Sequence, residues 1–208
     1  MNPCDPARKA GDSAAAGVGA RHQDEALLGQ ATRGLANDRA VTYRLHAETG
    51  ATTLSTLESL DTLAGETFDV AVTSLGVNDV TGMVSTTRWL QQQRELRQRL
   101  REQHGVQRLL ISSLPPMGDF PALPQPLRWY LGRRADDFTA LLRQDLQSEP
   151  HCEFLEMAFD RAPEMMASDG FHPGPPAYTA WGQKVAEVML AMTEQAGDSA
   201  GATIAAPE

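Results

Sequence analysis

The order of predicted strands and helices indicates an α/β protein built on a parallel sheet. Short apolar or β-branched runs alternate along the chain with longer segments whose apolar residues recur at helical spacing. Two of the runs have an apolar centre, as expected of strands that are buried on both faces. Because strand–helix–strand repeats favour parallel crossover connections, helices should cover both faces of the sheet.

Four segments are predicted strands. The runs at 68–75 and 108–112 are predicted to be buried parallel strands, and the run at 40–45 is rich in β-branched and aromatic residues. A weaker strand is predicted at 152–155. Ligands of such sheets bind beside the carboxyl ends of the strands. The loops that follow these segments are therefore where a functional site is expected.

Four apolar stripes predict helices that pack on the sheet. They comprise Leu54, Leu57, Leu60 and Leu63; Trp89, Leu96 and Leu100; Phe138, Leu141, Leu142 and Leu146; and Tyr178, Trp181, Val185, Val188 and Met192. Gly105 should cap the second of these helices, and a further helix is expected from the Ser13 loop to about Ala36. Residues 1–194 should form one domain. The tail, residues 195–208, is poor in bulky apolar side chains and is expected to be disordered.

Charge and composition argue against several classes of main partner. The 208 residues carry a net charge of -9 with a pI near 5.0, which argues against nucleic acid or an anionic membrane as the main partner. No apolar run reaches the ~20 residues of a membrane helix, and the start lacks the apolar stretch of a signal peptide. The chain as written should be cytoplasmic without stable membrane insertion; a longer native N-terminus would make it periplasmic or membrane-anchored. The sequence leaves the oligomeric state open.

Asp169 and His172 lie three residues apart on one predicted turn, and Ser13 ends the tripeptide Gly11-Asp12-Ser13. A carboxylate placed against one imidazole nitrogen leaves the other free to take a proton from a serine delivered by another loop. The same tripeptide recurs at 197–199, but that copy follows the last helix and no strand presents it. The spacing therefore predicts a nucleophile, base and orienting acid from Ser13, His172 and Asp169.

Gly50 and Asn78 follow two of the predicted strands. Alone, each would be read as an ordinary turn residue. Beside a nucleophilic serine, a glycine backbone N–H and an asparagine amide are donors of the kind that stabilise a tetrahedral oxyanion. Asp12 and Asp79 are interpreted as residues that hold their loops rather than as participants in the chemistry.

Taken in order, Ser13 in Gly11-Asp12-Ser13, Gly50, Asn78 in Gly76-Val77-Asn78-Asp79, and His172 in Asp169-Gly170-Phe171-His172 resemble the four motif blocks of the SGNH (GDSL) hydrolase family. The resemblance runs from about residue 11 to about 190 and is closest to bacterial esterases. It implies a flavodoxin-like three-layer α/β/α sandwich with a mostly parallel sheet of about five strands. It also implies hydrolysis of carboxylic esters through an acyl-enzyme on Ser13, without metal or cofactor.

The same resemblance implies roles for individual residues. His172 would be the general base and then the general acid, and Asp169 would orient it. The oxyanion hole would consist of the backbone N–H groups of Ser13 and Gly50 and the side-chain amide of Asn78.

The segment that precedes the serine motif departs from this family. Members have a strongly apolar central strand there, whereas residues 2–10 contain two prolines and an adjacent arginine and lysine. Proline cannot complete a ladder, and buried cations are costly. We therefore expect residues 1–10 to be an atypical segment in place of the first strand. Either this N-terminus is mis-started, frame-shifted or truncated relative to a parent protein with a proper first strand, or it is native and pairs poorly with the sheet.

The loop after the strand at 108–112 is rich in proline and apolar residues. Met117, Phe120, Leu123 and Trp129 in this loop are candidate walls of a substrate pocket; the alternative is a rigid connector with buried anchors. An apolar wall favours short- to medium-chain acyl esters or aryl esters. A lysophospholipase or thioesterase and a carbohydrate acetylesterase are the alternatives within the family. The basic run of Arg94, Arg97, Arg99 and Arg101 is interpreted as a solvated helix face rather than a phosphate site.

Two further function classes remain open from the sequence. A poorly placed Ser13 would make the protein an inactive relative. A flavodoxin-type module could instead bind a small ligand, since fold alone does not fix function. The glycine-containing stretch at 14–19, however, matches neither the Gly-x-Gly-x-x-Gly pattern nor the P-loop pattern.

Overall fold

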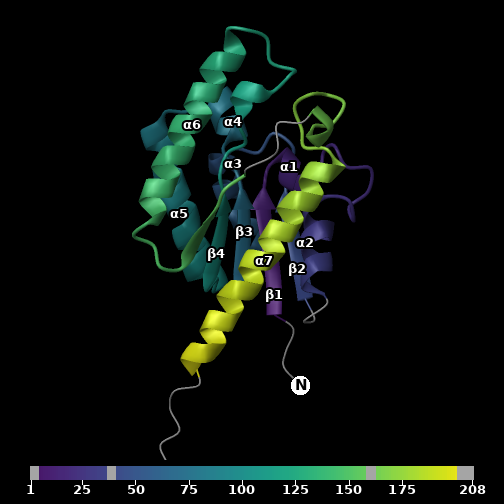
Figure 1. Ribbon diagram of the computed structural model, residues 1–208. Coiled ribbons are helices and arrows are strands. Elements are labelled where there is room, and N and C mark those ends of the chain that lie inside the picture. Colours follow the sequence, from purple (N-terminus) through teal and green to yellow (C-terminus); the bar gives the residue numbers. More distant parts are fainter. Residues whose placement is uncertain (1–4, 37–40, 158–162, 201–208) are drawn as a thin grey trace, which may run out of the picture.

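The computed structural model describes residues 5–36, 41–157 and 163–200, and its centre is a five-stranded sheet (Figure 1). All four strand pairings are parallel, and the strand order is β2-β1-β3-β4-β5. The strands are β1 (Asp5–Gly11), β2 (Val41–Ala47), β3 (Val70–Ser74), β4 (Arg108–Ser112) and β5 (Cys152–Leu155). This 2-1-3-4-5 order is that of flavodoxin-like doubly wound sheets, which confirms the expected fold class.

Helices cover both faces of the sheet and make two separate cores. The long helices are α2 (Leu27–Leu35), α3 (Thr53–Ser59), α5 (Thr86–His104), α6 (Leu127–Leu146) and α7 (Pro175–Ala200). Neighbouring residues of a strand point to opposite faces: Val70 and Val72 of β3 pack with α2 and α7, whereas Ala71 packs with α3, α5 and α6. The expected three layers are confirmed. The described residues also form five shorter helices: α1 (Ser13–Ala16), η1 (Leu60–Leu63), α4 (Val77–Thr81), η2 (Met117–Asp119) and η3 (Pro163–Met165).

Two helix predictions need correction. The helix expected from Ser13 to about residue 36 is interrupted: α1 ends at Gly17, whose φ of 93° is left-handed, and α2 begins only at Leu27. At the other end, α7 continues through Ala200. Residues 195–200 are therefore helical rather than part of a disordered tail, in keeping with the alanine, glutamate and glutamine of the last turns. Residues 201–208 lie outside the described part of the chain.

The segment expected to replace the first strand forms strand β1. Residues Asp5–Gly11 pair with β2 along their whole length and with β3 from Ala7 onward. Pro6 is tolerated because it lies near the start of the strand, beside Thr42 of β2 and before the pairing with β3 begins. Residues 1–4 lie outside the described residues. The expectation of an atypical segment in place of a strand is thus wrong for residues 5–10.

Candidate active site

Three hydrogen bonds join the loops at the carboxyl edge of the sheet. The backbone N–H of Asp12 donates to the carbonyl of Ser74 at 3.2 Å, and the N–H of Glu48 donates to the carbonyl of Gly11 at 3.3 Å. The amide of Asn78 donates to the carbonyl of Ala51 at 2.9 Å. The loops that follow β1, β2 and β3 are therefore held as one cluster.

Ser13 is presented by a close turn directly after β1. A Cβ at Gly11 would lie 2.3 Å from the Cβ of Ala15 and 2.8 Å from the carbonyl oxygen of Ser74, so only glycine fits there. Asp12 caps α1, accepting a hydrogen bond from the backbone N–H of Ala14 at 3.1 Å. Ser13 is the first residue of α1 and is 8% exposed. The geometry of the turn thus depends on the glycine and the aspartate of the motif.

His172 lies between Ser13 and Asp169. Its Nε2 is 3.1 Å from Ser13 Oγ, and its Nδ1 is 2.6 Å from Asp169 Oδ2. The other carboxylate oxygen of Asp169 accepts the backbone N–H groups of Phe171 at 2.9 Å and His172 at 3.0 Å. Asp169 therefore shapes the turn and also fixes the orientation of the imidazole. The fold brings together the three residues that the motifs single out.

The two carboxylates near His172 have opposite pKa shifts. Burial alone would raise the pKa of Asp169, but hydrogen bonds from the backbone and ring of His172 and from the backbone of Phe171 outweigh it and hold the pKa at about 2. Burial raises the pKa of Asp12 to about 6, against the opposing effect of backbone N–H groups and of His172. Asp169 is thus ionised throughout the neutral range, as a partner for an imidazolium must be.

Gly50 and Asn78 lie beside each other at the same edge. Gly50 has a φ of 83° in the turn after β2, and its neighbour Ala51 accepts the hydrogen bond from the Asn78 amide. Asp79 is fully buried and accepts the backbone N–H and the hydroxyl of Thr53, both at 3.0 Å. Asp79 therefore connects the loop after β3 to the start of α3, which is the structural role predicted for it. Burial raises its pKa.

A small apolar cavity of about 40 Å³ lies against Ser13 and His172. Its walls come from the loops after β3, β4 and β5, from the His172 turn and from α7. The residues are Asp12, Ala14, Ser74, Val77, Pro115, Phe120, Met157, Met166, Phe171, Pro173 and Trp181. Most of them were not singled out in the sequence. The local signals were Asp12, Val77 and Phe171, which lie inside the sequence motifs. Phe120 was predicted as a pocket wall.

Of the four residues predicted to wall a substrate pocket, Phe120 lines this cavity. Met117 is completely buried in the core between the sheet and α6, and Leu123 packs against the same core. Trp129 is 63% exposed on the first turn of α6. Substrate contact by any of the four stays a prediction.

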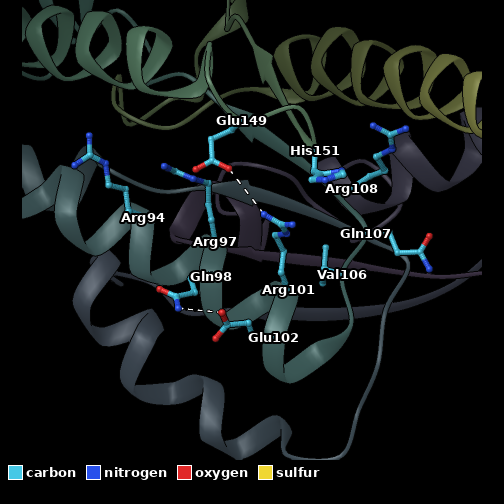
Figure 2. A pocket seen from close by; sticks show the side chains of 10 residues that line it. All are labelled: Arg94, Arg97, Gln98, Arg101, Glu102, Val106, Gln107, Arg108, Glu149 and His151. Atoms are coloured by element: carbon cyan, nitrogen blue, oxygen red, sulfur yellow. Dashed lines mark hydrogen bonds and ion pairs between the residues drawn. The ribbon is translucent and has the colours of Figure 1, made fainter.

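A second, much larger cavity of about 820 Å³ lies at the opposite edge of the sheet, where β4 and β5 begin (Figure 2). It is lined by Arg94, Arg97, Gln98, Arg101, Glu102, Val106, Gln107, Arg108, Glu149 and His151. Arg94 and Arg97 pair with Asp145, and Arg101 lies 3.9 Å from Glu149. The prediction of a solvated arginine face is wrong for Arg97, which is buried and paired in this structure. This cavity contains no serine or cysteine nucleophile.

Within the described part of the chain, no three His, Cys, Asp or Glu side chains are grouped as a metal site. None of the described helices is both long and apolar enough to cross a bilayer.

The model of the GDSL-like lipase/acylhydrolase family matches residues 10–180 of this chain, which include Ser13, Gly50, Asn78, Asp169 and His172. The chain belongs to this family. GDSL-like lipases and acylhydrolases are ester hydrolases, and hydrolysis of an ester is the general activity that this membership supports.

Several solved structures share the fold of this chain. The lipase Lip_vut3 from a goat rumen metagenome is 18% identical with a TM-score of 0.68, covering 87% of this chain and 95% of its own. A lipolytic G-D-S-L family protein from Veillonella parvula is 12% identical with a TM-score of 0.71, covering 90% and 99%. The lipase/acylhydrolase from Enterococcus faecalis is 17% identical with a TM-score of 0.61, covering 90% and 96%. No curated protein sequence matches the chain.

Proposed function

We propose that the protein is a serine carboxylesterase that hydrolyses esters of short acyl groups through an acyl-enzyme on Ser13. The observation that carries the proposal is the continuous contact from Ser13 Oγ through both nitrogens of His172 to the Asp169 carboxylate, at 3.1 and 2.6 Å. These distances lie within or close to hydrogen-bond reach, which a nucleophile and its general base require.

In the first half of the reaction, Ser13 Oγ forms a bond to the carbonyl carbon while its proton passes to His172 Nε2. The resulting imidazolium donates its Nδ1–H to Asp169, which is already ionised. The tetrahedral intermediate then expels the alcohol, which leaves with the proton from Nε2. The acyl group remains on Ser13 as an ester.

In the second half, a water molecule repeats the sequence in place of the serine. Nε2 takes its proton as the oxygen attacks the acyl carbon, and the Ser13 oxygen then leaves with that proton. The products are a carboxylic acid and the regenerated hydroxyl. One ester and one water thus yield one acid and one alcohol.

The negative oxygen of each intermediate needs fixed donors. The backbone N–H groups of Ser13 and Gly50 and the amide of Asn78 are the proposed donors. One amide hydrogen of Asn78 is used by the carbonyl of Ala51, and its second hydrogen is the one assigned to the oxyanion. A donor of this kind is typically worth about 2.7–4 kcal/mol in the transition state.

The size of the cavity beside Ser13 supports a short acyl group. Its volume of about 40 Å³ accommodates roughly three water-sized groups, taking ~10–15 Å³ for each. The acyl chain of an acetate or propionate ester matches this space, whereas an octanoyl chain would extend beyond it. Acetyl esters of carbohydrates remain a second candidate class because they share this acyl group.

The test is the hydrolysis of p-nitrophenyl acetate, butyrate and octanoate by the purified protein. Serine 199, in the second Gly-Asp-Ser tripeptide, provides a matched control. We expect Ser13→Ala to abolish turnover and labelling by a fluorophosphonate, Ser199→Ala to retain both, and the rate to fall from acetate to octanoate. Equal background rates in all three proteins would favour an inactive relative. An unlabelled protein that binds a small ligand would favour the binding-module alternative.

A further inference from the structure

The stretch 121–130, which joins η2 to α6, is almost entirely apolar and yet lies at the surface. Leu123 and Arg128 are half-buried, and the other residues of the stretch are exposed. Its polar side chains are Gln125 and Arg128, and it contains no acidic residue. Leu127, Trp129 and Tyr130 are among the most exposed large apolar residues of the described chain. We call residues 121–130 the apolar tip.

The apolar tip projects beyond the carboxyl edge of the sheet, on the side of the catalytic loops (Figure 1). The backbone N–H of Ala122 donates to the carbonyl of Gly170 at 3.1 Å, inside the turn that carries Asp169 and His172. Phe120, which precedes the tip, packs edge-on against Phe171 with ring centres 5.2 Å apart, and Phe171 packs in the same way against His172. The tip is therefore joined to the turn of His172 by a backbone hydrogen bond and by packed aromatic rings.

The tip also differs from the rest of the molecule in charge. Residues 120–135 contain Arg128, Arg133 and Arg134 and no acidic residue, whereas the whole chain carries a net charge of -9. Arg134 donates to the carbonyl of Val84 at 2.6 Å, and Arg133 is exposed. Asp119 precedes this stretch, and Asp136 and Asp137 follow it on α6, within about one helical turn of Arg133. Because charges are screened over about 8–10 Å at physiological salt, a surface that touches the tip experiences mainly the charge of Arg128, which lies more than two helical turns from Asp136 and Asp137.

We propose that the apolar tip docks the enzyme on a phospholipid surface. Tryptophan and tyrosine prefer the boundary between acyl chains and headgroups, and arginine pairs with lipid phosphates. Leu127, Trp129 and Tyr130 would enter the interface, with Arg128 and Arg133 at the level of the phosphates. The tip contacts the turn of His172, so docking brings the active site to esters held at that surface. Binding of the tip to phospholipid does not require Ser13 to act as a nucleophile.

Trp129 provides a built-in reporter of docking. The other two tryptophans, Trp89 and Trp181, are buried, so a change in emission on contact with lipid reports on Trp129. The Ser13→Ala protein is titrated with vesicles of phosphatidylcholine and phosphatidylglycerol, and the bound fraction is measured by co-sedimentation. We expect the emission to shift to shorter wavelength and acrylamide quenching to decrease as the protein pellets with the vesicles.

Two variants and a control make the test specific. Leu127→Ser combined with Tyr130→Ser keeps the reporter and should weaken vesicle partition by about tenfold or more. Arg128→Gln combined with Arg133→Gln should weaken partition to anionic vesicles and reduce its dependence on salt. Tyr43→Ser is the matched control: Tyr43 is 55% exposed on β2, away from the tip, and its loss should leave partition unchanged.

Three results would overturn the proposal. The first is an emission spectrum that vesicles leave unchanged. The second is a partition that Tyr43→Ser lowers as much as the tip variants do. The third is a shift that develops with protein concentration in the absence of lipid, which would assign the tip to contact with a second copy of the chain. Since binding is measured on Ser13→Ala protein, none of these results depends on esterase activity.

Discussion

The two edges of the sheet carry cavities of opposite character. At the carboxyl edge, a cavity of about 40 Å³ with mostly apolar walls lies against Ser13 and His172. At the other edge, a cavity of about 820 Å³ is lined by four arginines, two glutamates and a histidine (Figure 2). The larger and more highly charged cavity is lined by no serine or cysteine, whereas the smaller one is lined by the proposed nucleophile and base, and the proposed orienting acid contacts that base. Convergence of reactive groups, rather than cavity size, identifies the candidate site.

The direction of the chain explains this difference. Strands of a parallel sheet all end at one edge, so the loops that carry Ser13, Gly50, Asn78 and His172 are brought together there. The opposite edge receives the C-terminal end of α5, where Arg101 and His104 lie in the last turn. Cations are favourable at that position because they face the negative end of the helix dipole. The arginine-lined cavity is thus accounted for by helix packing and ion pairs.

The largest expected effect is on kcat, and it should differ between variants of the two histidines that line these cavities, His172 and His151. His172→Ala should lower kcat for p-nitrophenyl acetate by about 10⁴-fold or more, because loss of the base disables the catalytic unit. His151→Ala, at the arginine-lined edge, is the matched control and should retain the rate of the parent protein. A comparable loss of kcat in both variants would contradict the assignment of the reaction to the carboxyl edge alone.

Asn78→Ala should have the next largest effect. Removing one oxyanion donor is expected to lower kcat by about 10²–10³-fold. The variant also loses the bond to the carbonyl of Ala51, which should cost only about 1 kcal/mol of stability. Steady-state kinetics with a parallel thermal melt distinguish the two effects. A variant with a much lower melting temperature than the parent protein but the same kcat would show that the role of Asn78 is structural.

Asp12→Asn tests the burial of charge beneath the active site. The pKa of Asp12 is raised from 3.8 to about 6, so the folded state binds more protons than the unfolded state between these pH values. The free energy of unfolding of the parent protein should therefore fall as pH rises through this window, by up to about 3 kcal/mol. Asparagine keeps an oxygen for the Ala14 cap but cannot ionise.

Urea unfolding near pH 4 and near pH 8 measures this effect. The stability of Asp12→Asn relative to the parent should be greater at the higher pH. A difference that does not change with pH would show that the Asp12 carboxylate is not destabilised by its burial.

Arg101→Ala should have the smallest effect. Its ion pair with Glu149 is 3.9 Å long, and both side chains are more than one-third exposed. Such pairs contribute at most about 1 kcal/mol, so we expect a small change in melting temperature and an unchanged kcat/KM. A large loss of esterase activity in this variant would connect the arginine-lined cavity to the reaction.

Local sequence patterns were sufficient for the parts of the fold that depend on neighbouring residues. The strands predicted at 108–112 and 152–155 have those bounds in the structure, and Gly105 ends α5 with a left-handed φ of 65°. Apolar runs and a glycine cap leave a direct trace in the sequence because their energetics are local. The order of the four motifs likewise indicated the family and the residues now brought together at one edge.

Contacts between distant segments were decided only by the tertiary structure. Strand β1 forms despite Pro6 because β2 and β3 pair with its backbone on both sides, which no property of residues 5–11 reveals. Arg97 is buried because Asp145 of another helix pairs with it. Phe171 and Trp181 meet at the cavity although one lies on a turn and the other on α7. The sequence determined which chemical groups are present, and the packing of remote segments determined which of them touch.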